Sequence, residues 1–195
     1  MEGQIYRGVT GSAGEIGHLT IDENGPLCTC GNYGCLEAVA GGRAIAAQAQ
    51  EAVRKKQRTQ LTGILPVERI TAKDVAAAAR RGDLLSQQIL SRAGTQIGIA
   101  IAGLVNLINP GLVIIGGGVA QTGDLLLEPM RQAVQRRSLP AATRVVRITT
   151  AMLGRRSSSI GAVTQALTIA LNKVACRKEV RFPQLAHNSS LELQV

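Results

Sequence analysis

Aromatic residues are almost absent from this sequence of 195 residues, which has two tyrosines, one phenylalanine and no tryptophan. Proteins that hold single-stranded nucleic acid by stacking on its bases need exposed aromatic side chains, so this class of function is excluded. Cysteine is also scarce, with four residues in the chain. The sequence is therefore not a disulfide-rich secreted scaffold, and it indicates a reducing, cytoplasmic compartment.

A secretory leader and a long apolar run are both missing. Met1 is not followed by a basic patch and an apolar stretch. The segment between Arg92 and Asp124 carries no charge, but Asn109 and Pro110 interrupt it. Because a membrane span needs about 20 apolar residues in one element, this segment indicates a helix, a turn and a strand in a protein core. We expect no membrane partner.

Acidic residues are few, with 13 against 22 basic ones, which gives a net charge of +9. Apolar residues make up 45% of the chain, enough for a packed core rather than a disordered protein. The basic residues form short clusters at 54–56, 80–81 and 136–137. No DNA-reading motif accompanies these clusters, so we expect them to be solvated helix faces.

The hydrophobic pattern alternates between strands and helices and predicts an α/β fold. It predicts strands at 4–7, 18–21, 112–115 and 145–149, and helices at 36–58, 71–82, 85–108, 124–137 and 159–172. Thr71 and Asp74 have the spacing of a capping box. Strand, helix and strand after residue 112 form a βαβ unit, which implies a parallel pair. We expect one domain over 1–175 and an irregular tail over 176–195.

The strongest chemical signal is a histidine followed by three clustered cysteines. Cys28, Cys30 and Cys35 fall within eight residues, and His18 lies ten residues upstream of the first. Three thiolates and one imidazole complete the tetrahedral set of a zinc ion and leave no open position, so such an ion would be structural. The alternative is three buried cysteines and an unrelated histidine. Cys176 is interpreted as a non-ligand.

Two carboxylates lie beside this motif in the sequence. Glu15 precedes His18 by three residues, and Glu37 follows Cys35 by two. If the four ligands converge, both glutamates reach the same neighbourhood, where carboxylates can accept hydrogen bonds from sugar hydroxyls. Taken alone, each glutamate is more typical of a solvated surface.

Together these motifs resemble those of the ROK family of repressors, open reading frames and kinases. The resemblance rests on Gly-Ser-Ala-Gly-Glu-Ile-Gly-His at 11–18, Cys-x-Cys-Gly-x-x-Gly-Cys-x-Glu at 28–37, and Asn-Pro-Gly with Ile-Ile-Gly-Gly-Gly at 109–118. It covers roughly residues 3–172. It implies the C-terminal lobe of an actin-like ATPase (ribonuclease H-like) fold, with a mixed sheet, flanking helices and a zinc loop.

The resemblance also implies roles for particular residues. His18, Cys28, Cys30 and Cys35 would hold a structural Zn²⁺, while Glu15, Glu37 and His18 would bind a hexose or an N-acylhexosamine. The glycines at 116–118 end a predicted strand, where a tight turn is one explanation. The resemblance to the kinases of the family implies a nucleotide there, as ATP with Mg²⁺. A homo-oligomer is expected.

Three functions stay open at this point. The first is the sugar-binding lobe of a sugar-responsive transcription regulator, which would contact DNA only through an upstream domain; the stretch 155–159, Arg-Arg-Ser-Ser-Ser, favours it slightly. The second is the C-terminal half of a sugar kinase that transfers the γ-phosphate of ATP to a sugar hydroxyl. The third is a truncated, non-functional fragment. The ATP lobe and the general base are expected upstream, so we expect no catalysis by this chain alone.

Overall fold

The computed structural model describes residues 5–178. Contacts divide the chain into two compact units, one up to Gly154 and one from Arg155 onward, and each is described by itself. In the first unit α1 spans Leu36–Ala40, α2 Gly42–Arg54, α3 Ala72–Arg80, α4 Leu84–Ile108, β1 Leu112–Ile115, α5 Asp124–Arg137, α6 Pro140–Thr143 and β2 Arg147–Thr150. Short 3₁₀ turns are η1 (Ile16–His18), η2 (Gln60–Gly63), η3 (Val67–Arg69) and η4 (Val119–Thr122).

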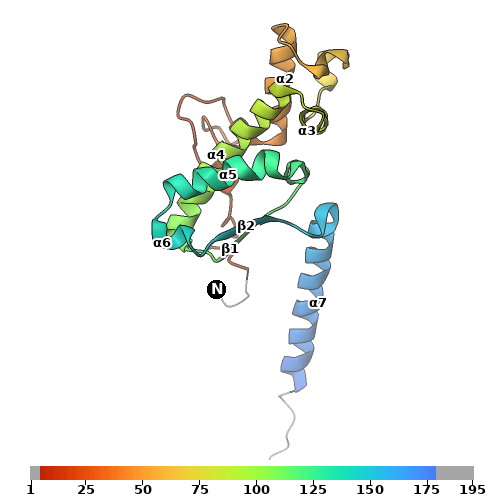
Figure 1. Ribbon diagram of the computed structural model, residues 1–195. Coiled ribbons are helices and arrows are strands. Elements are labelled where there is room, and N and C mark those ends of the chain that lie inside the picture. Colours follow the sequence, from red (N-terminus) through yellow and green to blue (C-terminus); the bar gives the residue numbers. More distant parts are fainter. Residues whose placement is uncertain (1–4, 179–195) are drawn as a thin grey trace, which may run out of the picture. The chain divides into compact units, whose positions relative to one another are not determined.

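Helix α4 is the centre of the first unit (Figure 1). Its N-cap is Asp83, whose carboxylate accepts a hydrogen bond from the backbone N–H of Ser86. It ends at Asn109, which adopts the left-handed conformation with φ 50° and precedes a proline. Both signals are typical of helix ends, and the helix predicted over 85–108 is confirmed. Figure 1 shows α2 and α3 towards one end of α4, with α6 and the sheet towards the other.

Close packing between α4 and α5 depends on two glycines. A Cβ atom on Gly94 would lie 2.3 Å from the carbonyl oxygen of Leu126, and one on Gly98 would lie 2.5 Å from that of Met130. Neither position leaves room for a side chain, so the two helix backbones approach directly. α4 makes its most extensive contacts with α5 for this reason.

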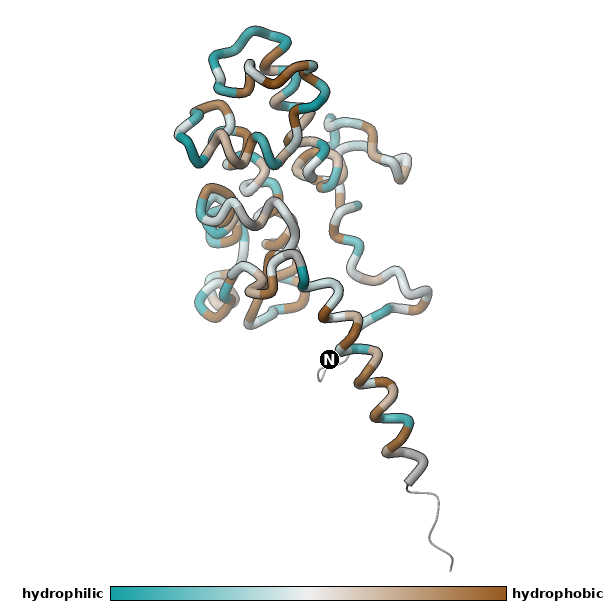
Figure 2. Tube along the Cα trace, turned by 90° about the vertical axis from the view of Figure 1, so that its right-hand side faces the viewer, coloured by the Kyte–Doolittle hydropathy of each residue, from teal (hydrophilic) through white to brown (hydrophobic). Residues whose placement is uncertain are grey.

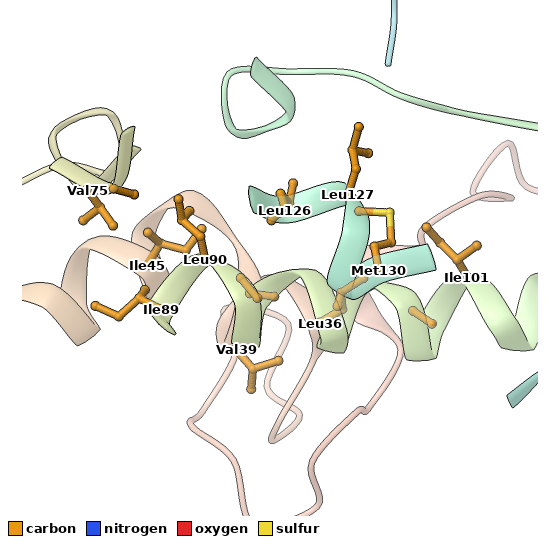
Figure 3. Packing of buried hydrophobic residues seen from close by; sticks show 14 of the residues in the cluster. Leu36, Val39, Ile45, Val75, Ile89, Leu90, Ile101, Leu126, Leu127 and Met130 are labelled. Carbon is orange, nitrogen blue, oxygen red and sulfur yellow. The ribbon is translucent and has the colours of Figure 1, made fainter. Parts of the chain in front are cut away.

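The hydrophobic core lies between α4 and the helices around it. Figure 3 shows Leu90 and Ile101 of α4 together with Leu126 and Met130 of α5 and Leu36 of α1. Leu90 and Met130 are completely buried. Small residues such as Ala93 and Ala100 fill the space between the larger ones. Elements far apart in sequence thus share one core, as is required for a single domain.

The sheet is a parallel pair. β1 and β2 are aligned from Leu112 with Arg147 to Ile115 with Thr150, which confirms the predicted βαβ unit. β2 begins two residues later than predicted, because the short helix α6 precedes it and the N–H groups of Val145 and Val146 bond to the carbonyl of Ala142.

Several predicted element boundaries were wrong. Residues 5–7 and 18–21 form no strand. In the second segment Thr20 makes an isolated bridge to Cys35, which is too short to be a strand. The predicted helix 36–58 is two helices, because Gly41 takes an extended conformation between them. Within residues 5–178 the sheet is parallel, not mixed, and antiparallel pairing is limited to isolated bridges.

The second unit contains α7, Ser157–Lys178, and the short turn η5 (Gly154–Arg156) begins at the last residue of the first unit. The helix predicted over 159–172 is confirmed, with observed bounds two residues earlier and six residues later. Residues 179–195 of the predicted tail lie outside the described residues. Apolar residues recur along the coloured part of α7 (Figure 2). None of the helices in the described part of the chain combines the length and hydropathy needed to cross a bilayer.

Candidate metal and sugar site

Glycines fold the loop that carries the cysteines. Gly31, with φ 91°, donates its N–H to the carbonyl of Cys28, and Cys28 in turn donates to Asn32 at 2.7 Å. Gly34, with φ 61°, packs so closely on Asp22 that an added Cβ would lie 1.5 Å from the carbonyl oxygen of that residue. The loop therefore turns at Gly31 and again at Gly34, and only glycine fits where the backbone of residue 34 crosses that of Asp22.

Four predicted metal ligands converge in this loop. The ligand atoms of His18, Cys28, Cys30 and Cys35 all lie within 4.8 Å of one another. The Sγ of Cys28 is 3.6 Å from Nδ1 of His18, and the Sγ atoms of Cys30 and Cys35 are also 3.6 Å apart. Cys28 and Cys35 are buried, whereas Cys30 is exposed. The histidine comes from η1, so the cluster joins two segments of the chain.

Both the donor set and the spacing suit a zinc ion. Four ligands at about 2.0–2.3 Å from a tetrahedral zinc lie about 3.3–3.8 Å from one another. Two of the separations, both 3.6 Å, fall in this range, and the others stay within 4.8 Å. All four positions are filled by protein atoms, which is the composition of a structural site rather than a catalytic one.

Two thiols of the cluster, Cys28 and Cys35, differ in acidity. A hydrogen bond from the backbone N–H of Cys30 is the largest cause that lowers the pKa of Cys28 to about 6, and the side chain of His18 adds to it. Burial, together with the neighbouring thiols Cys30 and Cys28, raises the pKa of Cys35 to about 12. Without a cation, deprotonation of Cys35 beside the thiolate of Cys28 is thus disfavoured. A divalent ion relieves this repulsion because it binds the deprotonated form.

Glu37 lies against the turn that carries His18. A Cβ on Gly17 would be 3.7 Å from the Cβ of Glu37 and 4.0 Å from its Oε2, so the carboxylate passes over a residue that has no side chain. Glu15 is the N-cap of the same turn, two residues before Gly17. Both carboxylates are exposed to solvent. The structure thus places Glu15, His18 and Glu37 on η1 and α1, which contact each other.

A small hollow extends from Glu37 towards α2. Its volume is about 240 Å³, and Leu27, Cys28, Thr29 and Arg43 line it with three alanines and Glu37. Cys28 therefore faces both the cysteine cluster and the hollow that Glu37 borders. Neither Glu15 nor His18 lines it. Of the two glutamates, Glu37 borders this hollow, and Glu15 lies on the turn against which Glu37 packs.

The three glycines at 116–118 lie at the carboxyl end of β1. Gly117 has φ 89°, and Gly116 and Gly117 line a hollow of about 190 Å³. Gly118 does not line it and is the N-cap of η4. In α/β sheets, ligands bind outside the carboxyl ends of parallel strands, which is the position of this hollow.

Sequence reasoning missed the opposite wall of this hollow. Thr150, Ala151 and Gly154, at and beyond the end of β2, line it together with Gly123. The signal was available, since parallel strands end at the same edge and residues after the second strand must face those after the first. The prediction considered only the strand with the glycine run.

Known proteins resemble this chain over most of its length. The chain is 40% identical over 166 residues to a glucokinase from Halalkalibacterium halodurans, which covers 82% of this chain and 49% of the relative. The solved structure of a ROK family transcriptional regulator, a homologue of the E. coli MLC protein, aligns with a TM-score of 0.72 at 35% identity, over 77% of this chain and 37% of that one.

A second solved structure is a ROK family glucokinase from Streptomyces griseus in complex with glucose and AMPPNP. It aligns with a TM-score of 0.70 at 31% identity, over 82% of this chain and 53% of that one. The chain therefore spans about half the length of the curated glucokinase it matches. Its helix-rich α/β fold is that of its structural neighbours. Residues 1–169 match the sequence profile of the ROK family, and the chain belongs to that family.

Proposed function

We propose that this chain is the sugar-binding lobe of a ROK transcription regulator, with a zinc ion that holds its sugar-binding residues in place. The observation that carries the proposal is the convergence of His18, Cys28, Cys30 and Cys35 next to Glu37. The same histidine belongs to the turn against which Glu37 packs, so fixing His18 also fixes that carboxylate. Bound zinc would supply no reaction chemistry at this closed site, only a rigid crosslink.

The sugar would be held through its hydroxyl groups. Glu37 and Glu15 are exposed acceptors on adjoining elements, and charged acceptors make stronger hydrogen bonds to hydroxyls than neutral ones. A ring nitrogen of His18 that bonds the metal leaves the other nitrogen free to act as a donor. A hexose or an N-acylhexosamine fits this set. The glucose in the related glucokinase structure supports the proposal.

A regulator is favoured because a sugar site can act without phosphoryl transfer. Binding to this lobe would bias the DNA affinity of a domain elsewhere in the whole protein, provided the sugar binds the two conformations unequally. The similarity to the MLC homologue supports this assignment. We expect these 195 residues alone to transfer no phosphoryl group from ATP to glucose.

The second candidate is the C-terminal half of an ATP-dependent sugar kinase. The hollow at the carboxyl ends of β1 and β2 favours it, because nucleotides bind at that position in α/β sheets. The 40% identity to a glucokinase supports it as well. In this case the backbone of Gly116 and Gly117 would approach a nucleotide, which a side chain at either position would hinder.

Calorimetric titration of the purified chain with glucose, N-acetylglucosamine and N-acetylmannosamine tests the sugar site. We expect one of these sugars to bind and Glu37→Gln to weaken it by about tenfold or more, because a hydrogen bond to a charged group is lost. Glu23→Gln, an exposed carboxylate in the neighbouring turn, is the matched control and should change the affinity less than about twofold. Absence of binding by all three sugars would refute the proposal.

Titration with AMPPNP separates regulator from kinase. The regulator predicts no binding in the glycine hollow. A kinase predicts binding that Gly117→Val abolishes, because Gly117 has φ 89° and valine does not adopt that conformation without strain. A chain that binds neither sugar nor AMPPNP would be the non-functional fragment.

A further inference from the structure

A further hollow in the first unit shares no lining residue with the sites above. Its volume is about 910 Å³, and it is bordered by the C-terminal half of α5, by α6 and by β2. Figure 1 shows these three elements next to one another. Sites for small molecules usually measure about 300–1,000 Å³, so this hollow is large enough for one.

All charged side chains that line the hollow are arginines: Arg131, Arg144 and Arg147. The guanidinium of Arg131 is already bound within the protein, since it donates to the carbonyl oxygen of Ile148 and pairs with Asp124 at 3.2 Å. Arg144 and Arg147 are exposed, and within residues 5–178 neither makes an ion pair. Two guanidinium groups are thus available to a ligand.

No carboxylate balances these arginines from within the hollow. Residues 129–154 contain five arginines and no acidic residue. Asp124 and Glu128 both pair with Arg131, and neither lines the hollow. An excess of one sign in a concave surface attracts counter-ions of the opposite sign, because the low-dielectric walls focus the field. The ligand that fits is an anion.

The residues that line the hollow besides the arginines indicate which class of anion it could bind. Leu112, Val134, Val146 and Ile148 contribute apolar surface, while Gln135, Thr143 and Thr149 contribute polar groups. The planar fork of a guanidinium matches the oxygens of a phosphate group in two parallel hydrogen bonds. The apolar surface beside the arginines suits an uncharged organic group esterified to the phosphate.

We propose that this hollow binds a phosphate ester of a small organic molecule, with Arg144 and Arg147 on the phosphate and the apolar lining against the body of the ligand. Arg131 positions β2, because it ties the exposed edge of that strand to α5. The site shares no residue with the cysteine loop or the glycine hollow, so it stands independently of the sugar-binding proposal.

Calorimetry with phenyl phosphate on the full chain tests the site, because this ester carries no sugar to engage Glu15 or Glu37. We expect binding at millimolar concentration, tighter than that of inorganic phosphate. Arg144→Glu with Arg147→Glu should weaken it by at least about tenfold. Arg136→Glu with Arg137→Glu changes the net charge equally on α5 outside the hollow and should weaken it by less than about twofold.

Three results would overturn the proposal. One is no binding of phenyl phosphate, and another is an equal loss in the two double variants, which would mean that only net charge matters. Binding of a DNA duplex through Arg144 and Arg147 without binding of the ester would also overturn it, in favour of a polyanion surface. Circular dichroism checks that the variants fold, and unchanged glucose binding would separate this result from the test of the sugar site.

Discussion

The carboxylate of Asp83 accepts a hydrogen bond of 2.8 Å from the hydroxyl of Thr59, 24 residues earlier in the chain. The same carboxylate accepts from the N–H and the hydroxyl of Ser86 and from the N–H of Gln60. It therefore caps α4 and fastens the loop before η2 to the start of that helix. Burial opposes the charge of Asp83, but these hydrogen bonds outweigh it and hold its pKa below the usual value.

Substitution of Asp83 tests its role as the N-cap of α4. Asp83→Ala should lower the free energy of unfolding by about 2–3 kcal/mol at pH 7, because it leaves several buried donors without a partner. Since the pKa is lower in the folded state than in the unfolded one, the contribution of the charge is present above about pH 4 and is lost as the pH falls through the folded pKa.

Urea unfolding at neutral pH and below pH 4 measures this dependence. Glu128→Gln is the control, since that carboxylate is exposed and should change stability by less than about 0.5 kcal/mol at either pH. A difference between Asp83→Asn and the parent that stayed constant down to low pH would contradict the role of the charge.

The close packing of α4 on α5 at Gly94 and Gly98 provides a second prediction. Gly98→Ala should lower the free energy of unfolding by about 1–3 kcal/mol, because its Cβ would lie 2.5 Å from the carbonyl oxygen of Met130 and the helices would have to separate. Gly103→Ala on the same helix meets nothing within 4 Å. It should instead stabilise the chain by about 0.5–1 kcal/mol, since glycine is a poor helix former. Thermal unfolding of the two variants should shift in opposite directions.

The cysteine loop can be disturbed without touching a ligand. Gly34→Ala should reduce the zinc content of the purified protein and its melting temperature, because the methyl group would collide with the carbonyl of Asp22. Gly31→Ala has a positive φ of 91° but open space around it, so it should cost about 1 kcal/mol and retain the metal. Metal analysis by mass spectrometry distinguishes the two. Equal metal content in both variants would argue against the crossing at Gly34.

Removal of a ligand is the direct test of the metal site. We expect one zinc per chain in the reduced protein, and Cys30→Ser to lose it together with several degrees of melting temperature. Cys176→Ser, which changes the remaining cysteine, should keep the ion. If the parent protein contained no metal and chelators left its melting unchanged, the cluster would be a set of packed thiols.

Local signals in the sequence were sufficient for the elements that end at strong caps. Thr71 and Asp74 form the capping box that their spacing predicts, with the hydroxyl of Thr71 accepting from the N–H of Asp74. The periodicity predicts the long α4, and Asp83 is a local N-cap signal that the prediction did not use, whereas its bonds to Thr59 and Gln60 come from a distant loop. Such contacts leave no periodic trace in the sequence.

The errors have physical causes as well. Gly41 and Gly42 were visible in the sequence, yet the break between α1 and α2 depends on Gly41 packing on the carbonyl of Glu37, where a Cβ would lie at 2.4 Å. α7 continues to Lys178 because residues 162–178 contain no glycine or proline to end it. In the candidate site the spacing predicted convergence of the four ligands, but not that Glu37 would pass over Gly17.

The position of Arg131 has a consequence for how the sheet can grow. In β2, Arg147 and Ala151 bond towards β1, so the carbonyl of Ile148 faces the opposite edge, where the guanidinium of Arg131 already occupies it. An additional strand on that side would have to displace a charged group that two carboxylates also hold. The arginine therefore protects the free edge of β2 against edge-to-edge pairing with another strand.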